Sequence, residues 1–222
     1  MRKKLLLLCL CLSGLFCARQ NASVTEEELV VNQLLSNIIN AGNPNALDKI
    51  VFSRSQADGS FVTQINATNL DFYIYFQFEG NRQIPFSDKD SRNWDVAFNR
   101  YKLATNSGET NRFGSGGACK SNRGSVADAS SVTPENQNCP SGNFVIDQNA
   151  ATQGIGGVGA TFIGNPLLTD WFNYEIGSLT TKGEIFIIRA GTGNSHYAMR
   201  MENYYSDAGT SGYPTIRWKK LP

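Results

Sequence analysis

The sequence predicts an all-β protein of antiparallel strands and long loops, with one short helix near the N-terminus. Three observations predict this fold class. The chain has 222 residues, 41% of them hydrophobic, which suits one main core. It contains 22 Asn and 21 Gly, nearly a fifth of the chain, and both residue types favour turns. From residue 49 onward, apolar and polar residues alternate over short runs, which is the period of a β-strand.

The charge balance argues against a nucleic-acid-binding protein. The formal net charge is +1, but Arg2, Lys3 and Lys4 belong to an N-terminal leader, and the rest of the chain has 17 basic and 19 acidic residues. Outside the leader, the chain therefore has no excess of basic residues that would attract phosphates. The single histidine excludes a multi-histidine metal site, and no metal site is predicted.

Residues 1–17 have the pattern of a lipoprotein-type signal peptide. Three basic residues precede an apolar run of twelve residues, Leu5–Phe16, which is too short to span a bilayer. Cys17 closes this run where a bacterial lipoprotein carries its lipidated cysteine. We therefore expect export, lipidation at Cys17 and a location at the outer membrane or the cell surface. The alternative is an ordinary secreted protein that is cleaved just downstream and released.

The cysteines of the mature chain predict a disulfide. Cys9 and Cys11 lie in the leader and Cys17 is the expected anchor, so Cys119 and Cys139 remain as a pair. In an oxidising compartment this pair is expected to form a bond that closes a loop of about 20 residues. Free thiols or a metal site are the alternatives, and a cysteine pair without neighbouring histidines is a poor zinc site.

Residues 18–47 predict a tether followed by an amphipathic helix. Thr25 and Glu28 resemble a capping box, and apolar residues recur at helical spacing over Glu26–Ala41. Gly42 and Pro44 end the element. We expect this helix to pack on the main body, with partner binding as the alternative.

Residues 48–222 predict one β domain. Strands are expected over 50–52, 61–65, 72–78, 94–98 with a continuation into 101–103, 171–174, 185–188, 197–204 and 215–218. Gly191–Asn194 predicts a hairpin turn. Trp94 shares an apolar face with Val96 and Phe98, so we expect it to be buried. Asp95 falls on the polar face, where a bond to a base such as Arg100 is expected.

Two long irregular stretches, 106–142 and 148–166, are the expected place for a ligand site. The second contains Gly154–Gly159, which fits the glycine pattern of dinucleotide-binding loops. The residues after it include Gly and Pro and cannot form the required helix, so a flexible loop is expected. The sequence shows no nucleophile or acid–base constellation, and its one histidine, His196, lies beside a turn. The chain is therefore not predicted to be an enzyme.

The segment Trp94-Asp95-Val96-Ala97-Phe98-Asn99-Arg100-Tyr101, followed by Asn106-Ser107-Gly108, strongly resembles the HmuY family of bacterial haem-binding lipoproteins. The motif residues are Trp94, Asp95, Arg100, Tyr101, Asn106 and Gly108. Weaker matches, which occur in the same order along the chain as in the family, extend the resemblance from residue 48 to about residue 220. The resemblance implies an antiparallel sheet framework with long loops that clamp haem, and it makes haem the expected cofactor.

In the HmuY family, two axial side chains, both His or both Met, hold the haem iron. The regions that the resemblance assigns to them, about 144–166 and 167–181, contain neither residue type. Met199 and Met201 are two residues apart, so on a strand they share one face and cannot hold the iron from opposite sides. We therefore expect Tyr174 or His196 as one axial ligand, since tyrosine also ligates haem iron.

The expected partners are haem or another small apolar ligand, the membrane through the lipid anchor, and a host or surface protein. The alternative function is a surface interaction module, similar to an adhesin, that keeps the fold without binding haem.

Overall fold

In a computed structural model, the described residues are 31, 42–151 and 161–222. The expected signal peptide 1–17, with Cys17, and the loop Gly154–Gly159 lie outside these residues. The expected helix Glu26–Ala41 also lies outside them, apart from Val31. Asn43–Pro222 form one compact unit. Within the described part of the chain, no helix is long and apolar enough to cross a membrane.

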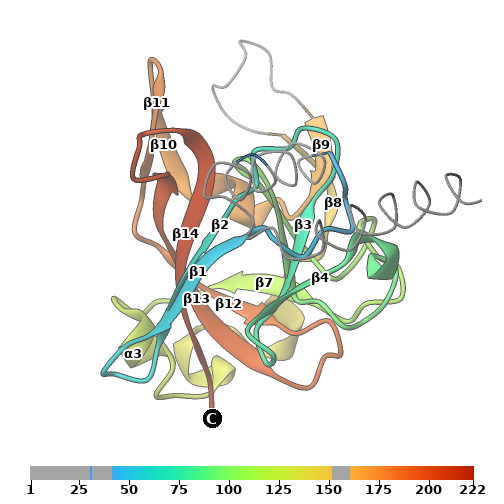
Figure 1. The fold of residues 1–222 in the computed structure, drawn as a ribbon. Helices are drawn as coiled ribbons and strands as arrows, with labels where there is room; N and C mark the ends of the chain where they lie inside the picture. Colours follow the sequence, from blue (N-terminus) through green and yellow to red (C-terminus); the bar gives the residue numbers. More distant parts are fainter. Residues whose placement is uncertain (1–30, 32–41, 152–160) are drawn as a thin grey trace, which may run out of the picture. The chain divides into compact units, whose positions relative to one another are not determined.

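The larger sheet of this unit has six strands in the order β1-β2-β14-β13-β12-β7, and neighbouring strands are antiparallel (Figure 1). The strands are β1 (Ile50–Ser55), β2 (Phe61–Ile65), β7 (Gly117–Lys120), β12 (Ile185–Arg189), β13 (His196–Tyr205) and β14 (Ser211–Lys220). The expected hairpin turn joins β12 to β13, and in it the N–H of Ala190 donates to the carbonyl oxygen of Ser195 at 2.8 Å.

A second antiparallel sheet has four strands in the order β4-β3-β5-β6, and two separate hairpins accompany it. The strands of the sheet are β3 (Ile74–Gln77), β4 (Arg82–Ile84), β5 (Val96–Asn99) and β6 (Lys102–Thr105). The hairpins pair β8 (Gln148–Ala151) with β9 (Thr161–Gly164) and β10 (Phe172–Glu175) with β11 (Ser178–Thr181). The short helical turns are α3 (Val126–Ala129), η1 (Phe86–Asp88), η2 (Pro134–Gln137), η3 (Ser141–Asn143) and η4 (Leu167–Asp170). The predicted all-β, antiparallel fold class is therefore confirmed.

The main hydrophobic core contains side chains from both sheets. Phe76 of the smaller sheet and Met199 and Trp218 of the larger sheet belong to one cluster and are at most 3% exposed. Phe78, directly after β3, stacks on Tyr197 of β13 with ring centroids 4.7 Å apart. Burial of such large apolar side chains is the main favourable contribution to folding.

β5 is buried on both of its faces. Val96 and Phe98 belong to the main core, whereas Trp94 packs with Tyr75 and Ala97 in a second cluster. Trp94 is fully buried, which confirms one prediction. The prediction that Trp94 shares a face with Val96 and Phe98 is wrong, because β5 begins at Val96 and the two-residue period of the strand does not extend back to Trp94.

The expected continuation of this strand into residues 101–103 is also wrong. The chain reverses after β5, because Asn99 pairs with Lys102 of β6 and two residues form the turn. The first of them, Arg100, has a φ of +52°, the left-handed conformation that some two-residue hairpin turns need. The N–H of Arg100 donates to the carbonyl oxygen of Ala67 at 2.8 Å. Neither of the two turn residues, Arg100 and Tyr101, is the glycine or asparagine that usually marks such a turn.

Asp95 does not bond to Arg100 as expected. Its carboxylate is buried and accepts hydrogen bonds from two backbone N–H groups, those of Phe78 at 2.8 Å and Gly191 at 3.0 Å. Arg100 instead donates to Oγ of Ser211 at 3.0 Å. Burial raises the pKa of Asp95, and the two backbone bonds oppose that rise. Asp95 thus joins the smaller sheet to the turn between β12 and β13.

The stretch 106–142 is more regular than expected, since it holds β7, α3 and two 3-10 turns. Cys119 of β7 is bonded to Cys139, with Cα atoms 5.7 Å apart, and the predicted disulfide is confirmed. Ser125 caps α3, because its Oγ accepts the N–H of Asp128 at 3.1 Å. Such short helical turns have little hydrophobic periodicity, so the pattern along the sequence did not indicate them.

Candidate ligand-binding site

The Asn-x-Gly segment of the sequence motif is held by polar contacts. Asn106 is fully buried, and its Nδ2 donates to the carbonyl oxygens of Trp94 at 2.8 Å and Ser91 at 3.0 Å. Its Oδ1 accepts a hydrogen bond from Nδ2 of Asn111 at 2.7 Å. These bonds hold the loop after β6 against the segment before β5.

Gly108 allows this loop to approach a second segment closely. Its φ is +54°, and a Cβ atom at this position would lie 2.0 Å from the carbonyl oxygen of Asp147. The N–H of Glu109 donates to the same oxygen at 3.0 Å. A residue with a side chain would therefore be strained and would displace the backbone of Asp147.

The side chain of Asp147 is almost completely buried and accepts hydrogen bonds from four residues, of which Ser107 donates its hydroxyl to Oδ1 at 3.5 Å. Thr105 donates its N–H to Oδ2 at 2.8 Å and its hydroxyl to Oδ1 at 2.5 Å. The hydroxyl of Thr110 donates to Oδ2 at 2.7 Å, and Nδ2 of Asn165 donates to Oδ1 at 3.0 Å. We call Thr105, Thr110, Asp147 and Asn165 the Asp147 cluster. Burial raises the pKa of Asp147 to about 6, although these bonds oppose the rise.

Asn165 connects the Asp147 cluster to both ends of the β8–β9 hairpin. Asp147 directly precedes β8 and Asn165 directly follows β9. Nδ2 of Asn165 also donates to the carbonyl oxygen of Val145 at 2.8 Å, and its Oδ1 accepts the N–H of Leu167 at 3.1 Å. The cluster thereby holds the base of the hairpin and the start of η4.

A cavity of about 610 Å³ is bordered by the β8–β9 and β10–β11 hairpins. Figure 1 shows both hairpins near the top of the view. The lining residues are Ala151, Pro166, Thr169, Asp170, Phe172, Asn173, Tyr174 and Lys182. Ala151 and Pro166 belong to the stretch 148–166, one of the two stretches where the sequence predicts a ligand site.

Tyr174 combines an aromatic ring with a hydroxyl on the wall of this cavity. It pairs across the hairpin with the buried Leu179, and it is itself 44% exposed. Lys182 forms an ion pair with Asp170 at the same cavity. The site therefore presents an accessible phenol, a cation and a carboxylate.

The other expected ligand, His196, does not line this cavity. It begins β13, and its ring centroid lies 5.3 Å from that of Phe144. Burial and then the charge of Arg189 lower the pKa of His196. Met199 and Met201 are buried in the main core, so neither is available at the cavity. The structure thus separates Tyr174 from the other three residues considered as iron ligands.

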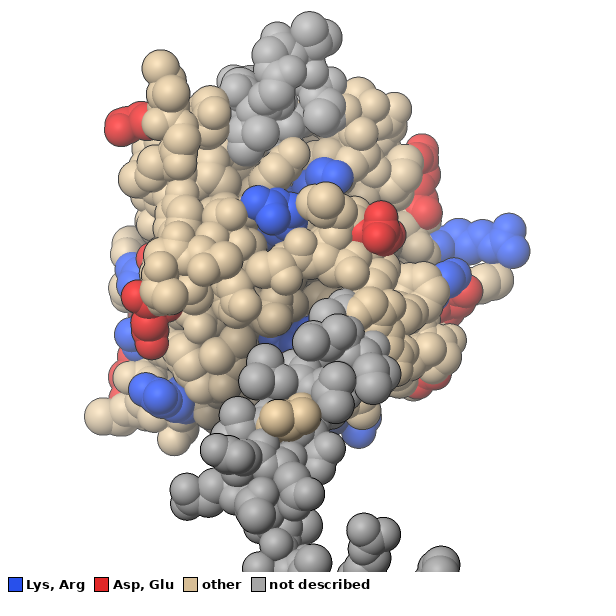
Figure 2. Space-filling view, turned by 45° about the horizontal axis from the view of Figure 1, so that its top comes forward, with Lys and Arg blue, Asp and Glu red and all other residues tan. Residues whose placement is uncertain are grey.

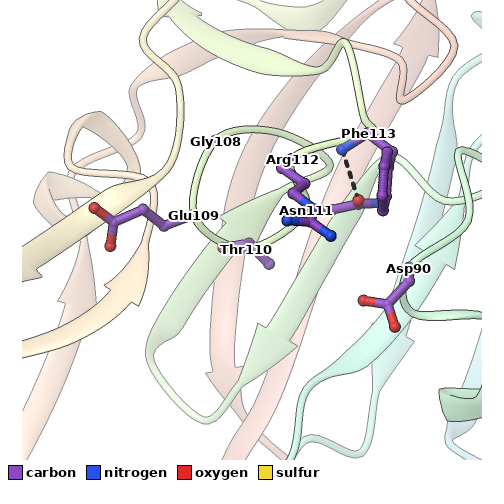
Figure 3. Close-up of a pocket in the computed structure, with 7 residues that line it drawn as sticks. All are labelled: Asp90, Gly108, Glu109, Thr110, Asn111, Arg112 and Phe113. Atoms are coloured by element: carbon purple, nitrogen blue, oxygen red, sulfur yellow. Dashed lines mark hydrogen bonds between the residues drawn. The ribbon is translucent and has the colours of Figure 1, made fainter.

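A second cavity, of about 580 Å³, lies beside the loop from Gly108 to Phe113 (Figure 3). Arg112 stacks over the ring of Phe113 at 4.9 Å from its centroid, and Asp90 borders the cavity. The N–H of Phe113 donates to Oδ1 of Asn111 at 3.0 Å. Phe113 is 59% exposed, so this loop presents an aromatic side chain to solvent.

The face shown in Figure 2 has few charged side chains, and the basic and acidic ones are interspersed. On the visible part of that face, neither the basic nor the acidic side chains form a large patch of one charge.

Sequence reasoning did not identify Asp147 and Asn165. The only signal was local, an acidic residue directly after the apolar run Phe144–Ile146. That pattern does not show that the carboxylate is buried, because its donors come from residues 18 to 42 positions away.

The HmuY protein family model matches residues 69–218, about two thirds of the chain. No curated protein matches the sequence. One similar solved structure is a Bacteroides fragilis protein described as a lipoprotein, with 20% identity and a TM-score of 0.53, and the match covers 75% of this chain and 93% of that one.

Two further solved structures have similar folds. A Bacteroides vulgatus protein described as HmuY-like and heme-binding has 18% identity and a TM-score of 0.54, with 75% of this chain and 94% of that chain covered. The apo HmuY analog of Tannerella forsythia has 15% identity and a TM-score of 0.53, with 79% and 100% covered. At these identities, the structures show a shared fold.

Proposed function

Because the chain belongs to the HmuY family, we propose that it is an exported, lipid-anchored protein that captures haem or a related porphyrin between its two hairpins. The observation that carries the proposal is the cavity beside Tyr174. Its volume of about 610 Å³ falls within the range of about 300–1,000 Å³ usual for small-molecule sites. The heme-binding description of the Bacteroides vulgatus protein supports the ligand class.

Two of the lining residues suit the chemistry of a porphyrin. Haem is flat and largely apolar, and it carries two carboxylates. The ring of Tyr174 offers apolar surface, and Lys182 offers a cation for a carboxylate. Haem binding would require Lys182 to exchange its partner Asp170 for the ligand, which limits the gain from this contact.

Iron ligation in this proposal rests on the Tyr174 phenolate. Tyrosine is an established haem ligand, and Tyr174 lines the cavity and is 44% exposed. His196, the alternative ligand, is in contact with Phe144. One axial ligand from the protein should give weaker binding than two, and a broad, high-spin Soret band.

The test is a haemin titration followed by absorbance. Wild type should show a Soret shift, Tyr174→Phe should lose most of it, and His196→Ala should keep it. Tyr213→Phe is the matched control, because Tyr213 of β14 does not line the cavity. A sharp low-spin spectrum that neither Tyr174→Phe nor His196→Ala changes would show that both proposed ligands are wrong.

A surface interaction module is the second candidate function. Two exposed apolar side chains support it: Ile176 at the tip of the β10–β11 hairpin is fully exposed, and Phe113 is 59% exposed. A host or surface protein would be the partner, since exposed aromatic and aliphatic side chains are typical anchors of protein interfaces. The absence of any Soret shift in wild type would favour this function over haem capture.

A further inference from the structure

We propose that Tyr205 is a positioning residue for Tyr174: its hydroxyl fixes the β10–β11 hairpin, which forms the part of the cavity wall that carries Tyr174. The inference rests on the proposed function, because Tyr174 is the residue proposed to ligate the haem iron. It adds a residue that does not line the cavity and that acts through Leu179, the partner of Tyr174 across the hairpin.

The β10–β11 hairpin is a two-stranded sheet of its own, because neither strand pairs with another strand of the described chain (Figure 1). All of its residues, 172–181, are described. Within the described ranges, one hydrogen bond joins these residues to the rest of the protein: the N–H of Leu179 donates to the hydroxyl oxygen of Tyr205 at 2.7 Å. An isolated two-stranded hairpin is marginally stable, so its position depends on its contacts with the rest of the protein.

The register of the hairpin places Tyr174 directly opposite Leu179. The N–H of Leu179 points to Tyr205 and away from β10, so the backbones of this pair do not bond to each other. In such pairs the two side chains lie closest together. Leu179 is buried in the main core, whereas Tyr174 is 44% exposed at the cavity. The bond to Tyr205 thus fixes the residue that lies opposite Tyr174.

Apolar packing also attaches the hairpin, but it restrains orientation less. Phe172 lies in the main core, and its ring centroid is 6.2 Å from that of Tyr101 and 4.8 Å from that of Trp171. Apolar attraction is non-directional, whereas a hydrogen bond depends on distance and angle. Loss of the Tyr205 hydroxyl should therefore leave the hairpin in place and widen the range of positions that Tyr174 occupies. A ligating group that is less preorganised binds more weakly.

Tyr205 can hold the hairpin because its own position is fixed by its neighbours. It ends β13 and pairs with Ser211 of β14. Its carbonyl oxygen accepts hydrogen bonds from Nδ2 of Asn203 at 3.2 Å and Nε2 of Gln64 at 3.4 Å. Its ring lies 5.3 Å from that of the buried Tyr204. The hydroxyl is therefore carried by the larger sheet, and the hairpin is positioned relative to that sheet.

The first part of the test is native-state hydrogen exchange of the ligand-free protein, read at the amides of Asn173 and Thr180, the next pair of the hairpin. Tyr205→Phe should raise their opening constant about tenfold, because the N–H of Leu179 loses its acceptor. In both proteins these amides should exchange faster than those of β12, which report global unfolding. Tyr213→Phe, at a half-buried tyrosine of β14, is the matched control and should behave as wild type. A rise of less than about twofold in Tyr205→Phe would overturn the proposal.

The second part is a haemin titration, which reports on the position of Tyr174 itself. Tyr205→Phe should weaken haem binding about tenfold. It should also weaken the phenolate-to-iron charge-transfer band of the saturated complex, which a general loss of stability would not change. Tyr213→Phe should keep the affinity and the band. An affinity within about twofold of wild type, with an unchanged band, would overturn the proposal.

The two measurements separate this inference from the proposed function. If wild type binds no haem, haem capture is wrong, and hydrogen exchange still decides whether Tyr205 holds the hairpin. If wild type binds haem but Tyr174→Phe keeps the full Soret shift, ligation by Tyr174 is wrong and the positioning role of Tyr205 falls with it.

Discussion

Oδ1 of Asp95 accepts a hydrogen bond from the N–H of Gly191 at 3.0 Å, although 96 positions separate the two residues. With the second bond, from the N–H of Phe78, the carboxylate ties the smaller sheet to the β12–β13 turn. Asp95→Ala would leave both buried donors without an acceptor, and we expect it to lower the free energy of unfolding by about 2–3 kcal/mol. Urea unfolding measures this loss, with the exposed Asp90→Ala as control. Equal stability of the two variants would contradict the structural role of Asp95.

Gly108 should tolerate no side chain. Gly108→Ala combines a φ of +54° with a Cβ atom 2.0 Å from the carbonyl oxygen of Asp147. We expect a loss of at least about 2 kcal/mol in unfolding free energy, since backbone must move to relieve the contact. Gly124→Ala is the matched control, because a Cβ atom there meets nothing within 4 Å. A Gly108→Ala protein as stable as this control would show that the loop does not approach Asp147 in solution.

Trp94 should contribute strongly to stability. Its ring lies 4.8 Å from that of Tyr75, and its Nε1 donates to the carbonyl oxygen of Lys89 at 2.8 Å. We expect Trp94→Ala to cost about 3–5 kcal/mol in unfolding free energy, the usual range for a large buried aromatic. Phe113→Ala, at an exposed aromatic, should stay within about 0.5 kcal/mol of wild type. A loss below about 1 kcal/mol for Trp94→Ala would place this side chain at the surface.

Cys17 is the proposed lipid anchor, and its removal should release the protein from membranes. Stable anchoring needs more than one acyl chain, and lipidation at Cys17 would supply these chains. Cys17→Ala should therefore move the protein from the detergent-extracted fraction to the soluble one. Cys11→Ala, within the leader, should leave the distribution unchanged. The lipoprotein proposal is wrong if Cys17→Ala still partitions with membranes and wild type takes up no labelled palmitate.

Part of the candidate site was predictable from the sequence. Ala151 and Pro166 of the stretch 148–166 line a cavity, and Tyr174 lines it too. The long glycine-rich loop indicated the first, and the family resemblance indicated Tyr174, whose role as a ligand stays a prediction. The Asp147 cluster was not predictable, because Thr105 and Asn165 lie 42 and 18 positions from Asp147.

The sequence by itself determined the strands with clear alternation, the turn between β12 and β13, the burial of Trp94 and, by elimination, the disulfide between Cys119 and Cys139. These features depend on side-chain type and on near neighbours. Only the tertiary structure decided the two-sided burial of β5 and the partners of Asp95 and Asp147. A sheet covered on both faces loses its alternation. A buried carboxylate is often satisfied by backbone N–H groups, and because nearly every residue carries one, no residue type marks the donor in the sequence.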